Sequence, residues 1–172
     1  MKTKKLELSE ITKIVDPIVD MRTNKWFLVS ATANGETNCL TAAWGALGNV
    51  WEKKTATVYI RPQRHTKKFM DKSGRFTMTY FEGHLKEMGY LGSTSGKDVA
   101  DKIEKSGLHL TTVNGMPTYE EGQLVLICRT LYRDSIKSEN FLDKAVEENA
   151  YPEKDYSVIY IAEIEEAYLI EK

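Results

Sequence analysis

The sequence predicts a mainly β fold, a small antiparallel β-barrel into which a few α-helices are inserted. The first observation is Asn34-Gly35, which lies between the two β-favouring runs KWFLVSATA and ETNCLTAAW. Both central residues of a type I′ hairpin turn need positive φ, and Asn and Gly adopt it readily. The second observation is a series of further short apolar runs, whose spacing and hairpin connections favour an antiparallel barrel over a doubly wound sheet.

The bulk composition limits the class of protein. The 172 residues predict one domain that spans residues 1–172. The formal charge of -1, from 24 basic and 25 acidic residues, gives no bulk attraction to nucleic acid or to an anionic membrane. No apolar run approaches the roughly 20 residues of a membrane-spanning helix, and MKTKKLELSE lacks the apolar core of a signal peptide. Two cysteines do not indicate a disulfide framework, so we expect a cytoplasmic protein.

Gly and Pro mark the element boundaries in the first half of the chain. Pro62 ends a strand because it cannot donate to a β-ladder, and Thr66 is suited to cap the helix that follows. We expect a lead-in strand or loop at 5–20, the hairpin at 25–44, a loop at 45–54, a strand at 56–61 and a short helix at 65–72.

Alternation and glycine positions predict the second half. The segment 97–107 has an amphipathic pattern, and Gly107 fits its C-cap. We expect strands at 75–81, 108–113 and 123–136, helices at 84–92 and 97–107, turn-rich chain at 114–122, a helical turn or two at 139–149, and a strand pair or one bent strand at 156–170. The strand at 123–136 is apolar enough to be central.

Small and hydroxyl residues at the end of the hairpin form the first candidate site. Thr41, Ala42, Ala43 and Trp44 offer close backbone approach, a hydroxyl and one aromatic ring. Such a strand end can meet the polar edge of a flat ligand. The alternative is ordinary packing, with Trp44 in the core.

A cationic loop follows directly and predicts a phosphate site. Arg61, Arg64, His65 and Thr66 precede or open the helix at 65–72. Guanidinium groups meet phosphate with paired donors, and a helix N-terminus adds free N–H groups. The alternative is a solvated basic loop. Together with the strand end, the loop points to a flat, phosphate-bearing ligand.

A third segment, Ser93 to Lys97, is a Ser/Thr/Gly loop that can form an anion-binding nest. The alternative is a helix-capping loop, with Ser95 or Asp98 as the cap. Cys39 lies beside the expected ligand edge, although burial as a small hydrophobe is the favoured interpretation. The three histidines lack metal-ligand spacing, so we expect no metal site.

Four segments together resemble the flavin reductase-like family, and its flavoredoxin-type members most. They are LVSATANGETNCLTAAWGALGNVW, VYIRPQRHTKKF, GSTSGKDVADK and GQLVLICRTLYRD, within a resemblance that runs from about Trp26 to about Ile161. The resemblance implies a six-stranded antiparallel Greek-key split barrel, a homodimer, and FMN bound near the dimer interface. Lys102 falls in the family's Asp-Lys pair. The implied cofactor-binding residues are Asn38, Thr41, Ala42, Ala43, Trp44, Arg61, Arg64, His65, Thr66, Ser95, Gly96 and Lys97.

These observations predict an FMN-binding flavoprotein that acts as an NAD(P)H-dependent flavin reductase. The chemistry would take place on FMN, so no side chain is expected to be catalytic. The alternative is a non-enzymatic FMN electron carrier that serves a redox protein partner. A second alternative is a barrel that binds another ligand, such as haem. The loop from Arg61 to Thr66 argues against haem, because it favours a phosphorylated ligand.

Overall fold

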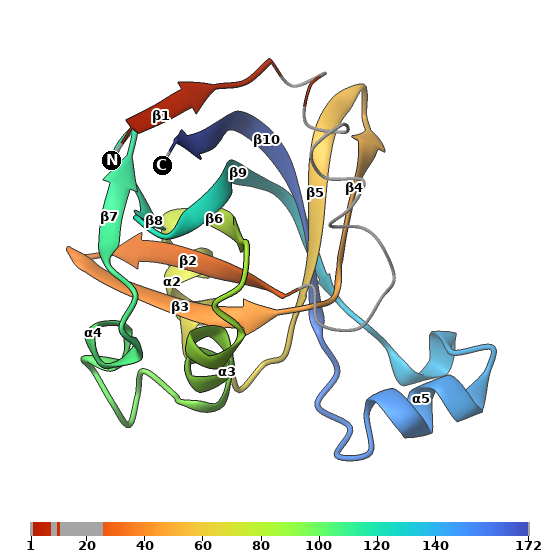
Figure 1. The fold of residues 1–172 in the computed structure, drawn as a ribbon. Coiled ribbons are helices and arrows are strands. Elements are labelled where there is room, and N and C mark those ends of the chain that lie inside the picture. The colour runs from red at the N-terminus through yellow and green to blue at the C-terminus, as the bar shows by residue number, and fades with distance from the viewer. Residues whose placement is uncertain (1, 8–9, 11–25, 172) are drawn as a thin grey trace.

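In the computed structural model, which describes residues 2–7, 10 and 26–171, one large antiparallel sheet curls into a barrel (Figure 1). Its strand order is β3-β2-β6-β9-β10-β5-β4, and β1 pairs with β10. The strands of this sheet are β1 Lys2–Lys5, β2 Phe27–Ala33, β3 Glu36–Ala42, β4 Gly45–Val50, β5 Lys53–Ile60, β6 Arg75–Phe81, β9 Gly122–Ser135 and β10 Val158–Glu171. The antiparallel barrel is confirmed. The described sheet holds 8 strands where six were expected, and the two additional ones are β1 and β4.

The hairpin of β2 and β3 is confirmed with its turn. Asn34 has φ 55° and Gly35 has φ 80°, as a type I′ turn requires. The two strands pair from Phe27 opposite Ala42 to Ala33 opposite Glu36. This register brings the end of β3 beside the start of β2.

The loop expected at 45–54 is wrong, because this segment forms a second hairpin. β4 pairs with β5 across a two-residue turn in which Trp51 has φ 53° and Glu52 has φ 60°. A turn of this type without Asn or Gly gives no sequence signal. β4 is an edge strand with mostly exposed residues, so it also lacks an apolar alternation. The strand expected at 56–61 is confirmed as β5.

The three central strands are β6, β9 and β10. β9 lies between β6 and β10, which confirms the expectation of a central strand at 123–136. β10 is one bent strand rather than a pair, with register shifts against β9 between Ile161 and Ala162 and between Ile164 and Glu166. Such shifts let a strand bend around a barrel.

The turn-rich segment expected at 114–122 contains a strand instead. β7 Leu110–Val113, expected from the sequence, pairs with β8 Met116–Tyr119 in a separate two-stranded sheet. The turn is again Asn-Gly, with Asn114 at φ 46° and Gly115 at φ 73°. Pro117 argues against a strand at this position in the sequence, but proline is tolerated in an edge strand such as β8.

Short helices occupy the connections. They are α2 Thr66–Ser73, α3 Leu85–Ser93, α4 Lys102–Ser106, α5 Lys144–Ala150 and the 3-10 turn η2 Ser138–Asn140. Two expectations are corrected. α4 begins five residues later than the helix expected at 97–107, and Thr66 does not cap α2, since its hydroxyl bonds Asn38. The lead-in expected at 5–20 lies largely outside the described residues; Leu6, which follows β1, is buried.

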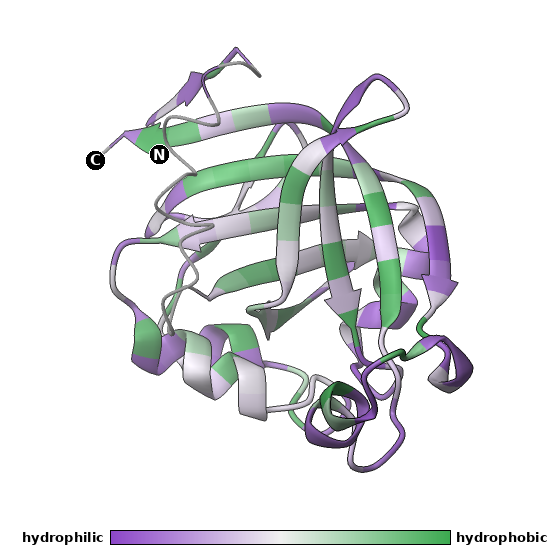
Figure 2. Ribbon diagram, turned by 90° about the vertical axis from the view of Figure 1, so that its right-hand side faces the viewer, coloured by the Kyte–Doolittle hydropathy of each residue, from purple (hydrophilic) through white to green (hydrophobic). Residues whose placement is uncertain are grey.

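Hydrophobic residues follow the strands and fill the barrel (Figure 2). Phe76, Met78, Leu126 and Tyr160 are almost fully buried in its main core. A second cluster, which includes Leu28, Cys39, Met88, Leu91 and Tyr119, joins α3 and α4 to the outside of β2 and β3. No helix in the described part of the chain is long and apolar enough to cross a membrane.

Candidate functional site

Two adjoining cavities lie where β3 ends and α2 begins. The first cavity has a volume of about 140 Å³. Its lining comes from β3, the loop before α2, the end of α3 and the start of α4. The residues are Asn38, Cys39, Leu40, Gln63, Arg64, His65, Thr66, Gly92, Ser93, Thr94, Ser95, Gly96 and Lys102.

A close polar contact shapes the first cavity. Thr66 Oγ1 donates to Asn38 Oδ1 at 2.8 Å, and this links α2 to β3. Gly96 packs so closely that a Cβ on it would stand 1.9 Å from Asn38 Nδ2. A larger residue at 96 would therefore force the Asn38 side chain or the loop to shift.

The buried Lys102 and the half-buried Arg64 line the first cavity, and its described lining residues include no carboxylate. Lys102 is 2% exposed, and its Nζ donates to Leu91 O at 3.1 Å and Thr94 O at 2.8 Å. Arg64 donates from Nη1 to Gly92 O at 2.8 Å. Burial lowers the pKa of both groups, and the charge of Arg64 lowers the pKa of Lys102 further. An anion in the cavity would stabilise both charges.

His65 is the third basic residue of the first cavity. Its ring lies edge-on to Phe69, with centroids 5.5 Å apart. Burial, followed by the charges of Lys68, Lys102 and Lys97, lowers the pKa of His65 below 6.5. The imidazole is therefore neutral at pH 7 and becomes easier to protonate when a negative group lies beside it.

The second cavity has a volume of about 170 Å³ and shares Leu40 and Arg64 with the first. One wall is the strand end Thr41 to Trp44, and the opposite wall comes from β5 and the residue before β10. The lining residues are Leu40, Thr41, Ala42, Ala43, Trp44, Tyr59, Ile60, Arg61, Arg64 and Ser157.

Some side chains of the second cavity already have hydrogen-bond partners within the protein, whereas others are exposed. Thr41 Oγ1 donates to Met88 O at 2.5 Å, so this hydroxyl is already engaged. Trp44 is 45% exposed, so the alternative interpretation of Trp44 as a core residue is wrong. Its indole offers an aromatic surface beside the small side chains of Ala42 and Ala43.

Arg61 lines the second cavity but is engaged elsewhere. It forms an ion pair with Asp155 and donates from Nη2 to Ala150 O at 2.6 Å. Its guanidinium also lies over the rings of Trp44, at 5.8 Å, and Tyr151, at 5.1 Å. The sequence-based assignment of Arg61 to a phosphate therefore competes with a structural role in holding residues 150–155.

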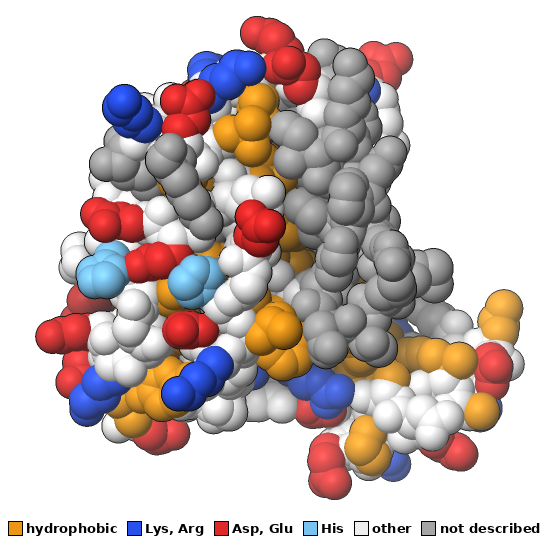
Figure 3. All heavy atoms as spheres, viewed as in Figure 1, with side chains coloured by type: hydrophobic (Ala, Val, Ile, Leu, Met, Phe, Trp, Pro, Cys, Tyr) orange, Lys and Arg blue, Asp and Glu red, His pale blue; other side chains and the backbone are white. Residues whose placement is uncertain are grey.

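Residues 136–157, called the arm below, leave the barrel after β9, carry α5 and return to β10 (Figure 1). Tyr151 packs edge-on against Trp44, with ring centroids 5.9 Å apart. Hydrophobic side chains are exposed on the outer part of the arm, at the lower right of Figure 3. Among them are Leu142, which is fully exposed, and Val146, which is 52% exposed.

The structure brings eleven of the twelve sequence-predicted site residues to these cavities. Lys97 is exposed and lines neither; its backbone N–H bonds Ser95 Oγ at 3.2 Å. Lys102 was recognised only through the resemblance. Thr94 lies in the third candidate segment, whereas Gln63, Tyr59 and Ser157 were not assigned to the site from the sequence.

Both cysteines are fully buried, as expected for Cys39. Burial raises the pKa of the Cys39 thiol, although Lys102 and Arg64 oppose this shift. No group of three or more His, Cys, Asp or Glu side chains that could hold a metal ion occurs among the described residues.

Comparison of the sequence with family models and with curated proteins gives no match. The structure is similar to an FMN-binding domain of a flavin reductases-like enzyme from Shewanella baltica, with 22% identity over 98% of this chain and 77% of that one, and a TM-score of 0.72. It is also similar to flavoredoxin from Methanosarcina acetivorans, with 18% identity, coverage of 88% and 74%, and a TM-score of 0.63. A third similar structure is nitrilotriacetate monooxygenase component B from Bacillus cereus, with 12% identity, coverage of 85% and 69%, and a TM-score of 0.63. The chain therefore has the split-barrel fold of flavin reductase-like proteins, as the resemblance implied.

Proposed function

We propose that this protein binds FMN and acts as an NAD(P)H-dependent flavin reductase. The observation that carries the proposal is the pair of adjoining cavities that share Arg64. One is lined by basic groups, of which Lys102 is buried, and the other has small residues and an aromatic surface. A ligand with an anionic end and a flat end fits this arrangement, and similar structures include proteins named as FMN-binding.

The first cavity fits a phosphate in its donor set. Arg64, Lys102 and His65 supply basic groups, and the backbone N–H of Thr66 at the start of α2 is a further donor, since Lys67 N and Lys68 N already donate to Arg64 O and His65 O. Thr66 Oγ1 is bonded to Asn38, so Thr66 contributes its backbone N–H before its hydroxyl. The close approach of Gly96 to Asn38 keeps the loop backbone at the cavity wall.

The second cavity fits a flavin ring. Because the Thr41 hydroxyl is engaged by Met88, the polar ring edge would be met mainly by backbone groups of Thr41 to Trp44. Ala42 and Ala43 allow the backbone to approach, and Trp44 covers part of the ring. When bound, FMN supplies the hydride and electron chemistry. The protein binds the phosphate, orients the ring and limits access of water.

A homodimer and a cytoplasmic location remain part of the proposal. Trp51 is 58% exposed and Tyr132 is 45% exposed, and their rings lie 6.3 Å apart on the outer face of the barrel. With Leu142 and Val146 on the arm, they give apolar surface that a second copy of the chain would cover. Light scattering on the purified protein should give twice the mass of the chain; a monomer would contradict the dimer.

The main test is reconstitution of the flavin-free protein with FMN, followed by absorption spectroscopy and titration. We expect a one-to-one flavoprotein that survives desalting and is bleached by NADH or NADPH without oxygen. Arg64→Ala should weaken FMN binding about 10- to 100-fold, as expected for loss of a charged hydrogen-bond donor. Lys72→Gln removes one charge from α2 outside both cavities and should leave affinity unchanged.

Each failure has a separate meaning. Protein that does not take up FMN would refute the proposed site. Protein that binds FMN but is reduced by neither nucleotide would refute the reductase and favour the electron carrier, a function that the flavoredoxins among the similar structures make the natural second candidate.

A further inference from the structure

Ser157 carries a buried hydroxyl with no hydrogen-bond partner in the described part of the chain. The residue is 0% exposed, lies directly before β10 and lines the second cavity. Burying a hydroxyl without a partner costs free energy, so such groups are rare in folded proteins. A ligand bound in the second cavity could supply the hydrogen-bond partner that the Ser157 hydroxyl lacks.

The other hydroxyls of the second cavity are less suited to this role. Thr41 Oγ1 is committed to Met88 O at 2.5 Å, and Tyr59 is partly exposed and can bond water. The Ser157 hydroxyl has no protein partner among the described residues and, being buried, is not exposed to bulk water. Its hydroxyl can donate or accept, so it can meet either a carbonyl or an N–H on a ring edge.

The position of Ser157 is fixed by its neighbours. Its backbone oxygen accepts from Ile136 N at 2.9 Å, which joins the two ends of the arm. Two residues earlier, Asp155 is held by Arg61 and by Gln63 Nε2 at 2.6 Å. The backbone at Ser157 is thus held in place beside the cavity, which lowers the entropic cost of a hydrogen bond to a ligand.

We propose that Ser157 Oγ hydrogen bonds a polar atom on the edge of the flavin ring in the second cavity. This inference rests on the proposed function and adds a ring-binding residue that no sequence motif marks. Because Ser157 lines only the second cavity and is uncharged, its contribution is independent of the phosphate. Its loss should therefore weaken FMN and riboflavin equally.

The test compares Ser157→Ala with Thr130→Val. Thr130 Oγ1 is the other buried hydroxyl without a described partner, but it lines a separate cavity of about 260 Å³. Both variants remove one unpaired hydroxyl at nearly constant shape, so both flavin-free proteins should be at least as resistant to urea as the wild type. Only Ser157→Ala should weaken binding, by about 3- to 10-fold for both FMN and riboflavin. It should also shift the absorption maxima and reduction potential of bound flavin.

A ligand-binding role predicts that Ser157→Ala weakens flavin binding without lowering the stability of the flavin-free protein. A structural role predicts that the flavin-free protein becomes less stable. Unchanged flavin affinity and spectrum in Ser157→Ala would overturn the inference while leaving the proposed function intact. A flavin-free Ser157→Ala protein less stable than the wild type would also overturn it, because the hydroxyl would then serve the fold. Wild-type protein that binds neither flavin would refute the proposed function itself, before any variant is made.

Discussion

At the scale of single residues, the first cavity depends on a contact that leaves no room for a side chain at 96. A Cβ there would stand 1.9 Å from Asn38 Nδ2, and Asn38 in turn holds Thr66. A change at this one position therefore disturbs β3, α2 and the loop before α4 together.

We predict that Gly96→Ala lowers the free energy of unfolding by about 1–3 kcal/mol, because Asn38 must move and its bond to Thr66 is strained or lost. Urea denaturation measures this change. Gly48→Ala is the matched control: nothing lies within 4 Å of a Cβ built at 48. Equal stability of the two variants would show that the 96 loop moves freely away from Asn38.

The sequence predicted which types of residue lie at the site, but not which contacts each individual residue makes. Arg61 and Arg64 lie in one short loop and look equivalent as phosphate ligands. Arg64 lies between the cavities, whereas Arg61 meets Asp155, far along the chain. Ser157 is remote in the same way. Which of several similar residues points into a site is decided by such long-range contacts, and local motifs do not contain them.

At the scale of elements, the arm depends on a small set of contacts with the barrel. Arg61 pairs with Asp155, and Tyr151 packs on Trp44. Hydrogen bonds from Arg61 and then Gln63 lower the pKa of Asp155 below 3.8. Because the folded-state pKa is depressed, the stabilisation is present at neutral pH and is lost as the pH falls through that lowered value.

We predict that Asp155→Asn speeds hydrogen exchange of the α5 amides several-fold at neutral pH, because the arm opens locally more often without the ion pair. Mass spectrometry of peptides from 141–157 reports this. Asp101→Asn removes the exposed Asp101–Lys105 pair of α4 and should leave α5 exchange unchanged. Identical α5 exchange in wild type and Asp155→Asn would mean that the aromatic contacts alone hold the arm.

Elements were predictable where the local pattern was strong. The hairpin at Asn34-Gly35 and the central strand β9 followed from composition and spacing, whereas the sequence left β10 open as a strand pair or one bent strand. β4 was missed because it is an exposed edge strand joined by a Trp51-Glu52 turn. β4 is stabilised by its pairing with β5 rather than by a β-favouring local sequence.

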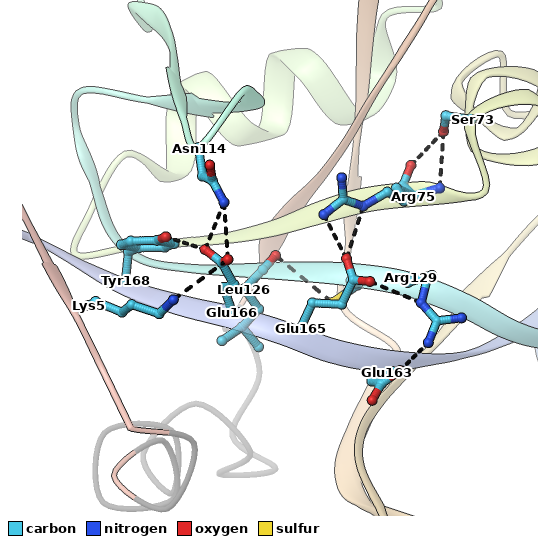
Figure 4. A network of polar contacts seen from close by, with 11 residues as sticks. Lys5, Ser73, Arg75, Asn114, Leu126, Arg129, Glu163, Glu165, Glu166 and Tyr168 are labelled. Atoms are coloured by element: carbon cyan, nitrogen blue, oxygen red, sulfur yellow. Dashed lines mark hydrogen bonds and ion pairs between the residues drawn. The ribbon is translucent and has the colours of Figure 1, made fainter.

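At the scale of the whole molecule, an ion-pair network ties four barrel strands together. Glu165 on β10 receives two bonds from Arg75 on β6, at 2.9 and 2.6 Å, and one from Arg129 on β9, at 2.9 Å (Figure 4). Arg129 also pairs with Glu163, which accepts from Lys53 on β5 at 2.8 Å. A network with shared partners is worth more than an isolated surface pair.

We predict that Glu165→Gln lowers the free energy of unfolding by about 1 kcal/mol at low salt and by less at high salt, because these side chains are partly exposed and screened. Urea denaturation at two salt concentrations tests this. Glu148→Gln is the control, since Glu148 is exposed and forms no ion pair with another described residue. A salt-independent loss would point to packing rather than charge.

β10 has a consequence for how the chain folds during synthesis. It is the last strand in the sequence, and it pairs with β1, β5 and β9. Until the ribosome has released Val158–Glu171, one edge of β5 and one edge of β9 have no partner. Unpaired edges recruit strands from other molecules, so the nascent chain is exposed to misassembly until β10 emerges. The barrel closes only once β10 has paired with β5 and β9, so chaperones that shield strand edges should raise the folding yield.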